Sequence, residues 1–163
     1  MMSVGPRIFR EVMGRLAGGV TVVTALDGDR RARGFTATAV CSVSLDPPLV
    51  LVCVGREAHT PSAIRHSGRY ALNFLCSDDA ATSDRFATEG SKFDGIEWHT
   101  APAGSPLLPG ILAWVECEVE QDVEAGDHTV FIGRVTAAAI GRTDRDPLVH
   151  FGGRYHTVAA MDP

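Results

Sequence analysis

The sequence predicts a mainly β protein, an antiparallel barrel with a few short helices. Segments rich in β-branched residues recur along the chain with turn residues between them, and the strand–helix–strand alternation of a parallel sheet is absent. The 163 residues fit one domain, 1–163, because no composition shift, internal repeat or low-complexity stretch marks a boundary.

Composition narrows the functional classes. A formal net charge of −5 argues against a broad basic surface for nucleic acid, so we expect no nucleic-acid partner. The four cysteines show neither C-x-x-C nor zinc spacing, which predicts reduced residues in or near the core, no metal site and a cytoplasmic location. The N-terminal segment lacks a continuous apolar run and the longest apolar stretch is short, so we expect no signal peptide and no membrane contact.

Three helices are expected. The first covers 6–16, with Pro6 in its first turn and apolar residues at helical spacing, and should lie on the barrel. The second covers 59–68, with Thr60 as the N-cap and Pro61 at the first helical position. The third covers 78–90.

The remaining periodic segments predict strands. Pro47 and Pro48 should end one of them, because proline cannot donate to a ladder, and Gly126-Asp127 should form a hairpin turn. A Pro/Gly-rich loop is expected at 104–110. The expected strands are 20–26, 34–45, 49–54, 69–76, 112–125, 129–140, and the closing pair 147–151 and 154–160.

No residues of a familiar catalytic motif stand out. The chain lacks the glycine-rich nucleotide loops, the G-x-S-x-G elbow and H-E-x-x-H, so an enzyme of this sequence would need a bound cofactor for the difficult step. The segment 34–48 is dense in small and hydroxyl residues, which let a flat ring approach the backbone and can bond ring heteroatoms or phosphates. Composition alone favours an ordinary strand with threonine chosen for β propensity.

The segment GFTATAVCSVSLDPPLVLVCV (34–54) resembles the signature of the short-chain flavin reductases, the reductase components of two-component flavin-dependent monooxygenases such as the 4-hydroxyphenylacetate and phenol hydroxylase systems. Further similar segments follow in order: RYALNFL (69–75), DRFA (84–87), SKFDGIEW (91–98), GDHTVFIGRV (126–135) and PLVHFGGRY (147–155). The resemblance implies an FMN-binding split β-barrel, a Greek-key antiparallel barrel. It also implies a homodimer that binds FMN or FAD and uses NADH or NADPH.

The resemblance also assigns residues to the flavin. The strand that would line the isoalloxazine and reach the phosphate comprises Thr36, Ala37, Thr38, Ala39, Val40, Cys41 and Ser42. Cys41 is interpreted as a small packing residue rather than a redox group. Thr60 would place the phosphate at a helix start, where the dipole favours an anion, or would simply cap that helix. The other implied contacts are Val54, Gly55, Arg56, Arg85, Phe86, Lys92 and Phe93, with a solvated loop charge the alternative for Lys92.

The corner Gly126-Asp127-His128 resembles the nicotinamide-binding GDH motif of the family. His128 would stack on or bond the nicotinamide, which makes it the candidate catalytic residue, and Asp127 would lie beside the cofactor. The alternative is a polar turn residue. Tyr155 resembles the aromatic residue that closes the pocket, with core packing as its alternative.

The resemblance therefore implies hydride transfer from NAD(P)H to flavin N5, by a ping-pong or sequential route, with reduced flavin passing to a separate oxygenase. Two alternatives stay open at this point. One is a split barrel that holds FMN tightly and oxidises another small substrate. The other is a non-catalytic flavin- or haem-binding module.

Overall fold

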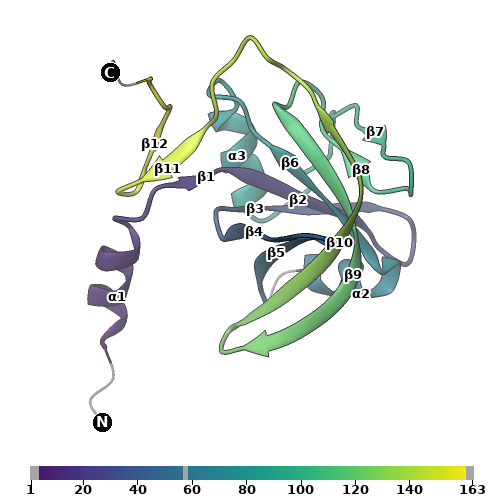
Figure 1. Ribbon diagram of the computed structural model, residues 1–163, viewed down its shortest axis with the longest axis horizontal. Coiled ribbons are helices and arrows are strands. Elements are labelled where there is room, and N and C mark those ends of the chain that lie inside the picture. The colour runs from purple at the N-terminus through teal and green to yellow at the C-terminus, as the bar shows by residue number, and fades with distance from the viewer. Residues whose placement is uncertain (1–3, 57–58, 161–163) are drawn as a thin grey trace.

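The computed structural model describes residues 4–56 and 59–160. Strands dominate the described residues, which confirms the prediction of a mainly β fold with a few short helices (Figure 1). The helices are α1 (Pro6–Met13), α2 (Thr60–Ser67) and α3 (Ala80–Ala87). The strands are β1 (Gly18–Gly19), β2 (Thr21–Leu26), β3 (Ala32–Ala37), β4 (Val40–Leu45), β5 (Pro48–Gly55), β6 (Arg69–Phe74), β7 (His99–Thr100), β8 (Pro106–Leu107), β9 (Ala113–Ala125), β10 (His128–Ile140), β11 (Val149–Phe151) and β12 (Arg154–His156).

A seven-stranded antiparallel sheet forms the body, in the order β3-β2-β6-β9-β10-β5-β4. Its edge strands β3 and β4 are consecutive in the chain, so the sheet curls strongly enough for two residues, Thr38 and Ala39, to connect its two edges. The described ladders do not join β3 to β4, so hydrogen bonding leaves the curled sheet open at that seam. Two small sheets, β1-β11-β12 and β7-β8, flank the body.

The expected continuous strand 34–45 is wrong. The chain bends at Thr38 because its two halves pair with different neighbours: Ala37 lies opposite Thr21 of β2, whereas Val40 lies opposite Val52 of β5. The residues before and after the bend have a similar apolar and hydroxyl composition, so the sequence does not mark the break. The break depends on strand pairing, because β3 pairs with β2 and β4 pairs with β5.

The barrel interior is filled by apolar side chains and closed at one end by α2, whose Ala63 and Ile64 are buried. Gly68 ends α2 in the left-handed conformation, at φ 66°. At Gly133 a Cβ atom would lie 2.7 Å from the Cβ of Cys117 and would also meet the Tyr70 hydroxyl. Glycine at this point of β10 therefore makes room for Tyr70 inside the barrel.

A second apolar cluster lies under α3. Phe86 is fully buried there, and its ring meets Phe93 edge to face with the centroids 5.0 Å apart. A Cβ on Gly34 would lie 3.0 Å from the Phe86 ring, so glycine in β3 lets the helix approach the sheet. This contact fixes α3 beside β3.

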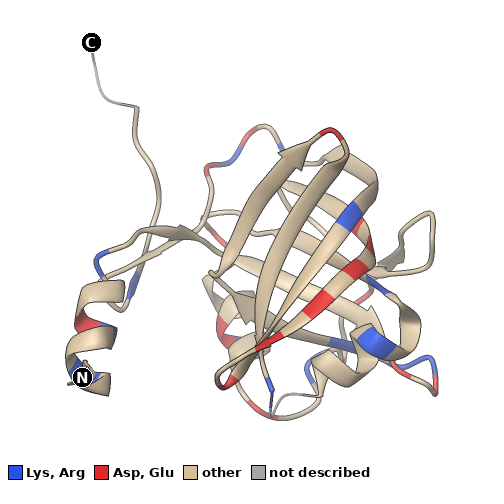
Figure 2. Cartoon of the chain, turned by 60° about the horizontal axis from the view of Figure 1, so that its bottom comes forward, with Lys and Arg blue, Asp and Glu red and all other residues tan. Residues whose placement is uncertain are grey.

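The prediction that helix 6–16 lies on the barrel is wrong. The helix ends at Met13, none of its residues is buried, and it stands beside the body in both views (Figures 1 and 2). Gly152 N–H donates to Gly14 O at 2.8 Å and ties the end of this segment to the β11–β12 hairpin. The exposed apolar residues of this segment include Ile8, Phe9, Val12, Met13 and Leu16.

Smaller differences concern helix starts, a loop and one cysteine. His59, not Thr60, is the N-cap of α2, and no side chain caps that helix. The expected loop 104–110 contains the short strand β8. Cys41 is exposed on β4 rather than packed in or near the core, because β4 is an edge strand with an open face.

Acidic and basic residues both lie along the β9–β10 hairpin (Figure 2). Among the described residues, no helix has the length and apolarity that a bilayer crossing requires.

Candidate functional site

The predicted flavin strand presents small residues at an open edge of the barrel. Thr38, Ala39, Cys41 and Ser42 are exposed, whereas Ala37 is buried. Thr36 is half-buried, and its hydroxyl donates to Ser83 O at 2.6 Å. The exposed residues therefore form the part of this segment that a planar ligand can approach.

The predicted nicotinamide corner lies at the same end of the neighbouring strands as the start of β4, where β5 ends and β10 begins. Gly55, at the end of β5, pairs with His128, at the start of β10. Arg56 N–H donates to Asp127 O at 3.0 Å, and its guanidinium donates to Gly126 O at 3.2 Å. The structure thus brings together Gly55, Arg56, Asp127 and His128, which the sequence separates by about seventy positions.

A hydrogen bond to Asp127 sets the orientation of the His128 ring. Its Nδ1 lies 2.7 Å from Asp127 Oδ1, and this bond is the first cause that lowers the pKa of the Asp127 carboxyl. A charged carboxylate only accepts, so Nδ1–H must donate and Nε2 is left for another partner. The imidazole is about half exposed and can therefore meet a bound molecule.

A third group of predicted residues lies around α3. Lys92 Nζ donates to Phe86 O at 2.8 Å, and burial lowers the pKa of its amine. The Arg85 guanidinium donates to Asp94 O. The Tyr155 hydroxyl donates to Asp84 Oδ1 at 2.7 Å and lies 2.9 Å from Ser83 Oγ, while burial raises its pKa.

These three groups are connected through the sheet. Ser83 bonds both Thr36 and Tyr155, which places the α3 group beside β3. Cys53 N–H donates to Ala39 O at 3.0 Å, which places the flavin strand beside β5 and its end at Gly55. The structure therefore gathers most of the predicted residues along one seam of the barrel.

Four predicted residues have buried side chains that do not face that seam. Ala37, Val54 and Phe86 belong to the two apolar clusters, and Thr60 is 3% exposed at the start of α2. Their side chains therefore pack the core. Only their main-chain groups remain as candidates for contact with a cofactor.

An open cleft of about 550 Å³ lies at the GDH corner. Asp127 and His128 line it from the hairpin, together with three residues of α1 that the sequence prediction did not assign to a site. The full lining is Pro6, Phe9, Arg10, Cys53, Ala125, Asp127, His128 and Val130. The neighbouring aromatic and basic residues Phe9 and Arg10 on this helix are the signal in the sequence that could have indicated a binding role.

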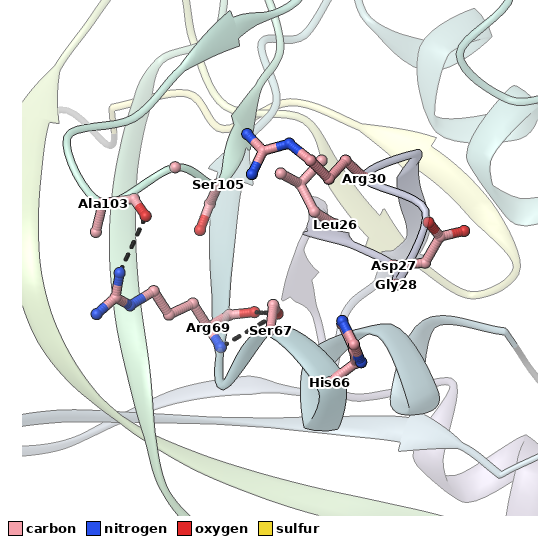
Figure 3. A pocket seen from close by; sticks show the side chains of 10 residues that line it. Leu26, Asp27, Gly28, Arg30, His66, Ser67, Arg69, Ala103 and Ser105 are labelled. Atoms are coloured by element: carbon pink, nitrogen blue, oxygen red, sulfur yellow. Dashed lines mark hydrogen bonds between the residues drawn. The ribbon is translucent and has the colours of Figure 1, made fainter.

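A separate hollow of about 300 Å³ contains none of the predicted site residues (Figure 3). Two of its charged groups, Asp27 and Arg69, make contacts within the fold. The Arg69 guanidinium donates to Ala103 O and pairs with Glu118, and Asp27 pairs with Arg33 at 2.7 Å. The lining comprises Leu26, Asp27, Gly28, Arg30, His66, Ser67, Arg69, Ala103, Gly104 and Ser105.

One cluster in the described residues has metal-ligand types, Cys76, Asp78 and Asp79. Asp79 accepts the Cys76 N–H at 2.9 Å, and Asp78 pairs with Arg145 at 3.1 Å. Burial raises the pKa of the Cys76 thiol, which donates to Gly110 O at 3.2 Å. Their polar atoms are engaged within the fold, and we assign no metal to them.

Comparison with known proteins identifies the family. Residues 13–159 match the model of the flavin reductase like domain. This chain belongs to the flavin reductase-like family. The match covers most of the chain and includes the flavin strand and the GDH corner.

Relatives of this flavin reductase-like chain carry names from the same chemistry. The reductase subunit HsaB of a flavin-dependent monooxygenase from Rhodococcus jostii is 38% identical over 154 residues, 94% of this chain and 78% of that protein. The FMN reductase (NADH) RutF from Ancylobacter novellus is 36% identical over 154 residues, 93% of this chain and 84% of that protein. Two relatives from Rhizobium meliloti are longer, and the chain spans 43% and 58% of their lengths.

The solved structures agree with the family. The NADH:FAD oxidoreductase SgcE6 of Streptomyces globisporus C-1027, in complex with NAD and FAD fragments, matches with a TM-score of 0.87 at 35% identity and 98% coverage of both chains. The flavin reductase PheA2 matches with a TM-score of 0.86 at 39% identity, covering 96% of this chain and all of that one. These neighbours have the split-barrel fold of flavin reductases and confirm the predicted fold and family.

The residues of the seam fit a flavin. Exposed small side chains at Thr38 and Ala39 leave space for a ring close to the backbone, and no heavy atom lies within 4 Å of the position a Cβ would take on Gly55. The hydroxyl of Ser42 and the guanidinium of Arg56 offer donors for ring heteroatoms or phosphate oxygens. These exposed small residues and donors are therefore compatible with a flavin at this edge.

Proposed function

We propose that this chain is an NAD(P)H:flavin oxidoreductase that reduces FMN or FAD and supplies the reduced flavin to a separate monooxygenase. The observation that supports it is the juxtaposition of the exposed small-residue seam with the oriented His128 at the same side of the barrel. The relatives named as reductases and reductase subunits support the same reaction. The chain's own residues need only hold two planar molecules together.

The division of labour follows from that geometry. The nicotinamide nucleotide supplies a hydride and the flavin accepts it. Thr38 and Ala39 let the flavin ring lie near the main chain, and Asp127 holds the His128 ring with Nε2 turned to the nucleotide. Positioning of this kind lowers the barrier to hydride transfer because the two reactants are already oriented when they are bound. No nucleophile of the protein is required.

The flavin phosphate is proposed to lie where β5 ends and α2 begins. Arg56 supplies a half-exposed guanidinium at that point. The first main-chain N–H groups of α2 have no partner within the helix, and the helix dipole favours an anion there. Thr60 would contribute through its main chain, since its side chain is buried.

We propose a homodimer as the working assembly. Apolar side chains that would normally be buried are exposed on α1 and β4, among them Val12 at 61% and Leu45 at 91%. A second copy covering these residues would remove that surface from water. Light scattering at micromolar concentration should give twice the chain mass, and a monomer would contradict this assembly.

We propose a cytoplasmic location and delivery of reduced flavin by diffusion to the oxygenase. The four cysteines are free, and Cys41 is exposed, which suits a reducing compartment. NAD(P)H is also available there. The exposed seam suits release of a flavin between turnovers.

A steady-state assay tests the reaction. Purified protein should oxidise NADH or NADPH only when FMN, FAD or riboflavin is added. Absence of oxidation in every combination would remove the reductase proposal. A tightly held flavin without NAD(P)H oxidation would instead favour a flavoprotein that oxidises another small substrate, and binding without any turnover would favour a flavin- or haem-binding module.

A further inference from the structure

Helix α1 lines the GDH cleft although it contributes nothing to the core. Pro6, Phe9 and Arg10 face the hollow that Asp127 and His128 line from the opposite side. These three positions follow helical spacing and form one face of α1. Ile8 and Val12, one turn apart, do not line the cleft. The helix thus presents one surface to the cleft and leaves another for the second copy proposed above.

Arg10 brings an unneutralised positive charge to this cleft. The neighbouring Arg7 pairs with Glu11 at 3.1 Å, so the one acidic residue of α1 is already engaged. Within residues 4–56 and 59–160 no carboxylate lies within ion-pair distance of the Arg10 guanidinium. The Asp127 carboxylate, which shares the cleft, is held by His128 Nδ1 instead. An anion entering the cleft therefore meets a guanidinium with free donors.

The remaining walls suit a molecule with flat apolar parts. The Phe9 side chain is 59% exposed and lines the cleft, as do Cys53, Ala125 and Val130. A volume of about 550 Å³ is within the range of small-molecule and cofactor sites. The cleft therefore combines an aromatic ring, a cation and an imidazole.

We propose that α1 forms one wall of the nicotinamide nucleotide site and that Arg10 binds the pyrophosphate of NAD(P)H while His128 meets the nicotinamide. This inference rests on the proposed function. Both NADH and NADPH contain a pyrophosphate in the same molecule as the nicotinamide ring. A guanidinium matches phosphate oxygens with two parallel N–H donors, which fixes the nucleotide in register with His128.

The variant Arg10→Gln tests the contact, with Arg7→Gln as the matched control on the same helix. Arg7 does not line the cleft, and the side chains of its exposed pair with Glu11 are 88% and 55% exposed, so its loss should leave binding unchanged. Calorimetric titration with NAD⁺ reports binding without turnover. Kinetics at saturating FMN report KM for NADH and NADPH, and fluorescence quenching reports the Kd for FMN.

Arg10→Gln should raise the Kd for NAD⁺ and the KM for both reduced nucleotides by roughly 5–20-fold, as expected for a charge-assisted hydrogen bond at a partly exposed site. The Kd for FMN should stay within about twofold of wild type. Binding of NAD⁺ to wild type should weaken with added salt more steeply than binding to the variant, because an exposed charge contact is screened.

Each result bears on a different statement. If wild type oxidises NAD(P)H but Arg10→Gln binds NAD⁺ as wild type does, the assignment of α1 is wrong and the reductase proposal stands. A loss confined to NADPH would overturn the pyrophosphate contact, because that nucleotide differs only by its 2′-phosphate. If Arg7→Gln weakened NAD⁺ binding as much as Arg10→Gln does, the specific contact of Arg10 would be wrong, and the effect would come from the net charge of α1.

Discussion

At the scale of single residues, the Asp127–His128 pair carries the clearest functional signal. The 2.7 Å bond between Nδ1 and Oδ1 fixes the ring and frees Nε2. A turn residue without function would have no need of a fixed ring. The two explanations of His128, nicotinamide contact and surface turn, therefore differ in what truncation should do.

His128→Ala should lower kcat/KM for the nucleotide by roughly 5–30-fold while the Kd for flavin stays unchanged, because a contact of about 1–2 kcal/mol is lost. His99→Ala is the control, since His99 is exposed on β7 and lies outside the cleft. Thr38→Leu should do the reverse and weaken flavin binding first. Unchanged nucleotide kinetics in His128→Ala would assign the corner to a plain turn.

At the scale of elements, a buried carboxylate organises the loop between β7 and β8. Glu116 on β9 is fully buried and accepts the N–H groups of Ala103 at 2.7 Å and Ser105 at 2.8 Å. Those main-chain donors belong to a segment with little regular structure of its own. The loop therefore depends on one side chain of a neighbouring strand.

Glu116→Gln should lower the free energy of unfolding by about 1–3 kcal/mol, because the amide can accept only one of the two N–H groups. Glu118→Gln, two residues along the same strand, removes only an exposed pair with Arg69 and should cost about 0–1 kcal/mol. Urea unfolding measures both. Faster hydrogen exchange at Ala103 and Ser105 should accompany the first variant, and equal costs for the two variants would contradict this account.

At the scale of the whole molecule, burial of weak acids ties stability to alkaline pH. Burial raises the pKa of Cys117 from 9.0 to about 12 and raises the pKa of Tyr70 above its ordinary value of 10.0. Cys53 and Cys76 are shifted in the same direction, also by burial. Unfolding exposes these groups, so above about pH 9 the unfolded chain releases protons that the folded chain keeps.

The stabilisation from these groups is therefore fully present below about pH 9 and is lost as pH rises toward 12. Cys117 alone should contribute a loss of roughly 1.4 kcal/mol per pH unit in this range. Urea unfolding of Cys117→Ala between pH 8 and 10.5 should show a shallower decline than wild type. Cys41→Ala, at an exposed position, should keep the wild-type slope. An identical decline in Cys117→Ala would mean that other groups govern alkaline unfolding.

The sequence by itself determined the features that local chemistry controls. Alternation of apolar and polar residues predicted β9 and β10, and Gly126-Asp127 predicted the turn between them. The ends of the predicted helix 59–68 and of the predicted strand pair 147–151 and 154–160 fall at Gly68 and Gly152-Gly153, which adopt the positive φ that glycine alone readily reaches. The similar segments, which follow one another in order along the chain, were sufficient to predict the family.

Only the tertiary structure decided what depends on distant partners. The bend at Thr38 exists because β3 and β4 pair with different strands, and local composition contains no record of that choice. Val54 and Phe86 face the core because the sheet curls and α3 packs on β3. The amphipathic pattern of 6–16 predicted a helix, but a pattern specifies an apolar face and not what covers it. Its place at the GDH cleft came from the path of the chain after Gly14, where Gly152 N–H donates to Gly14 O and β1 pairs with β11.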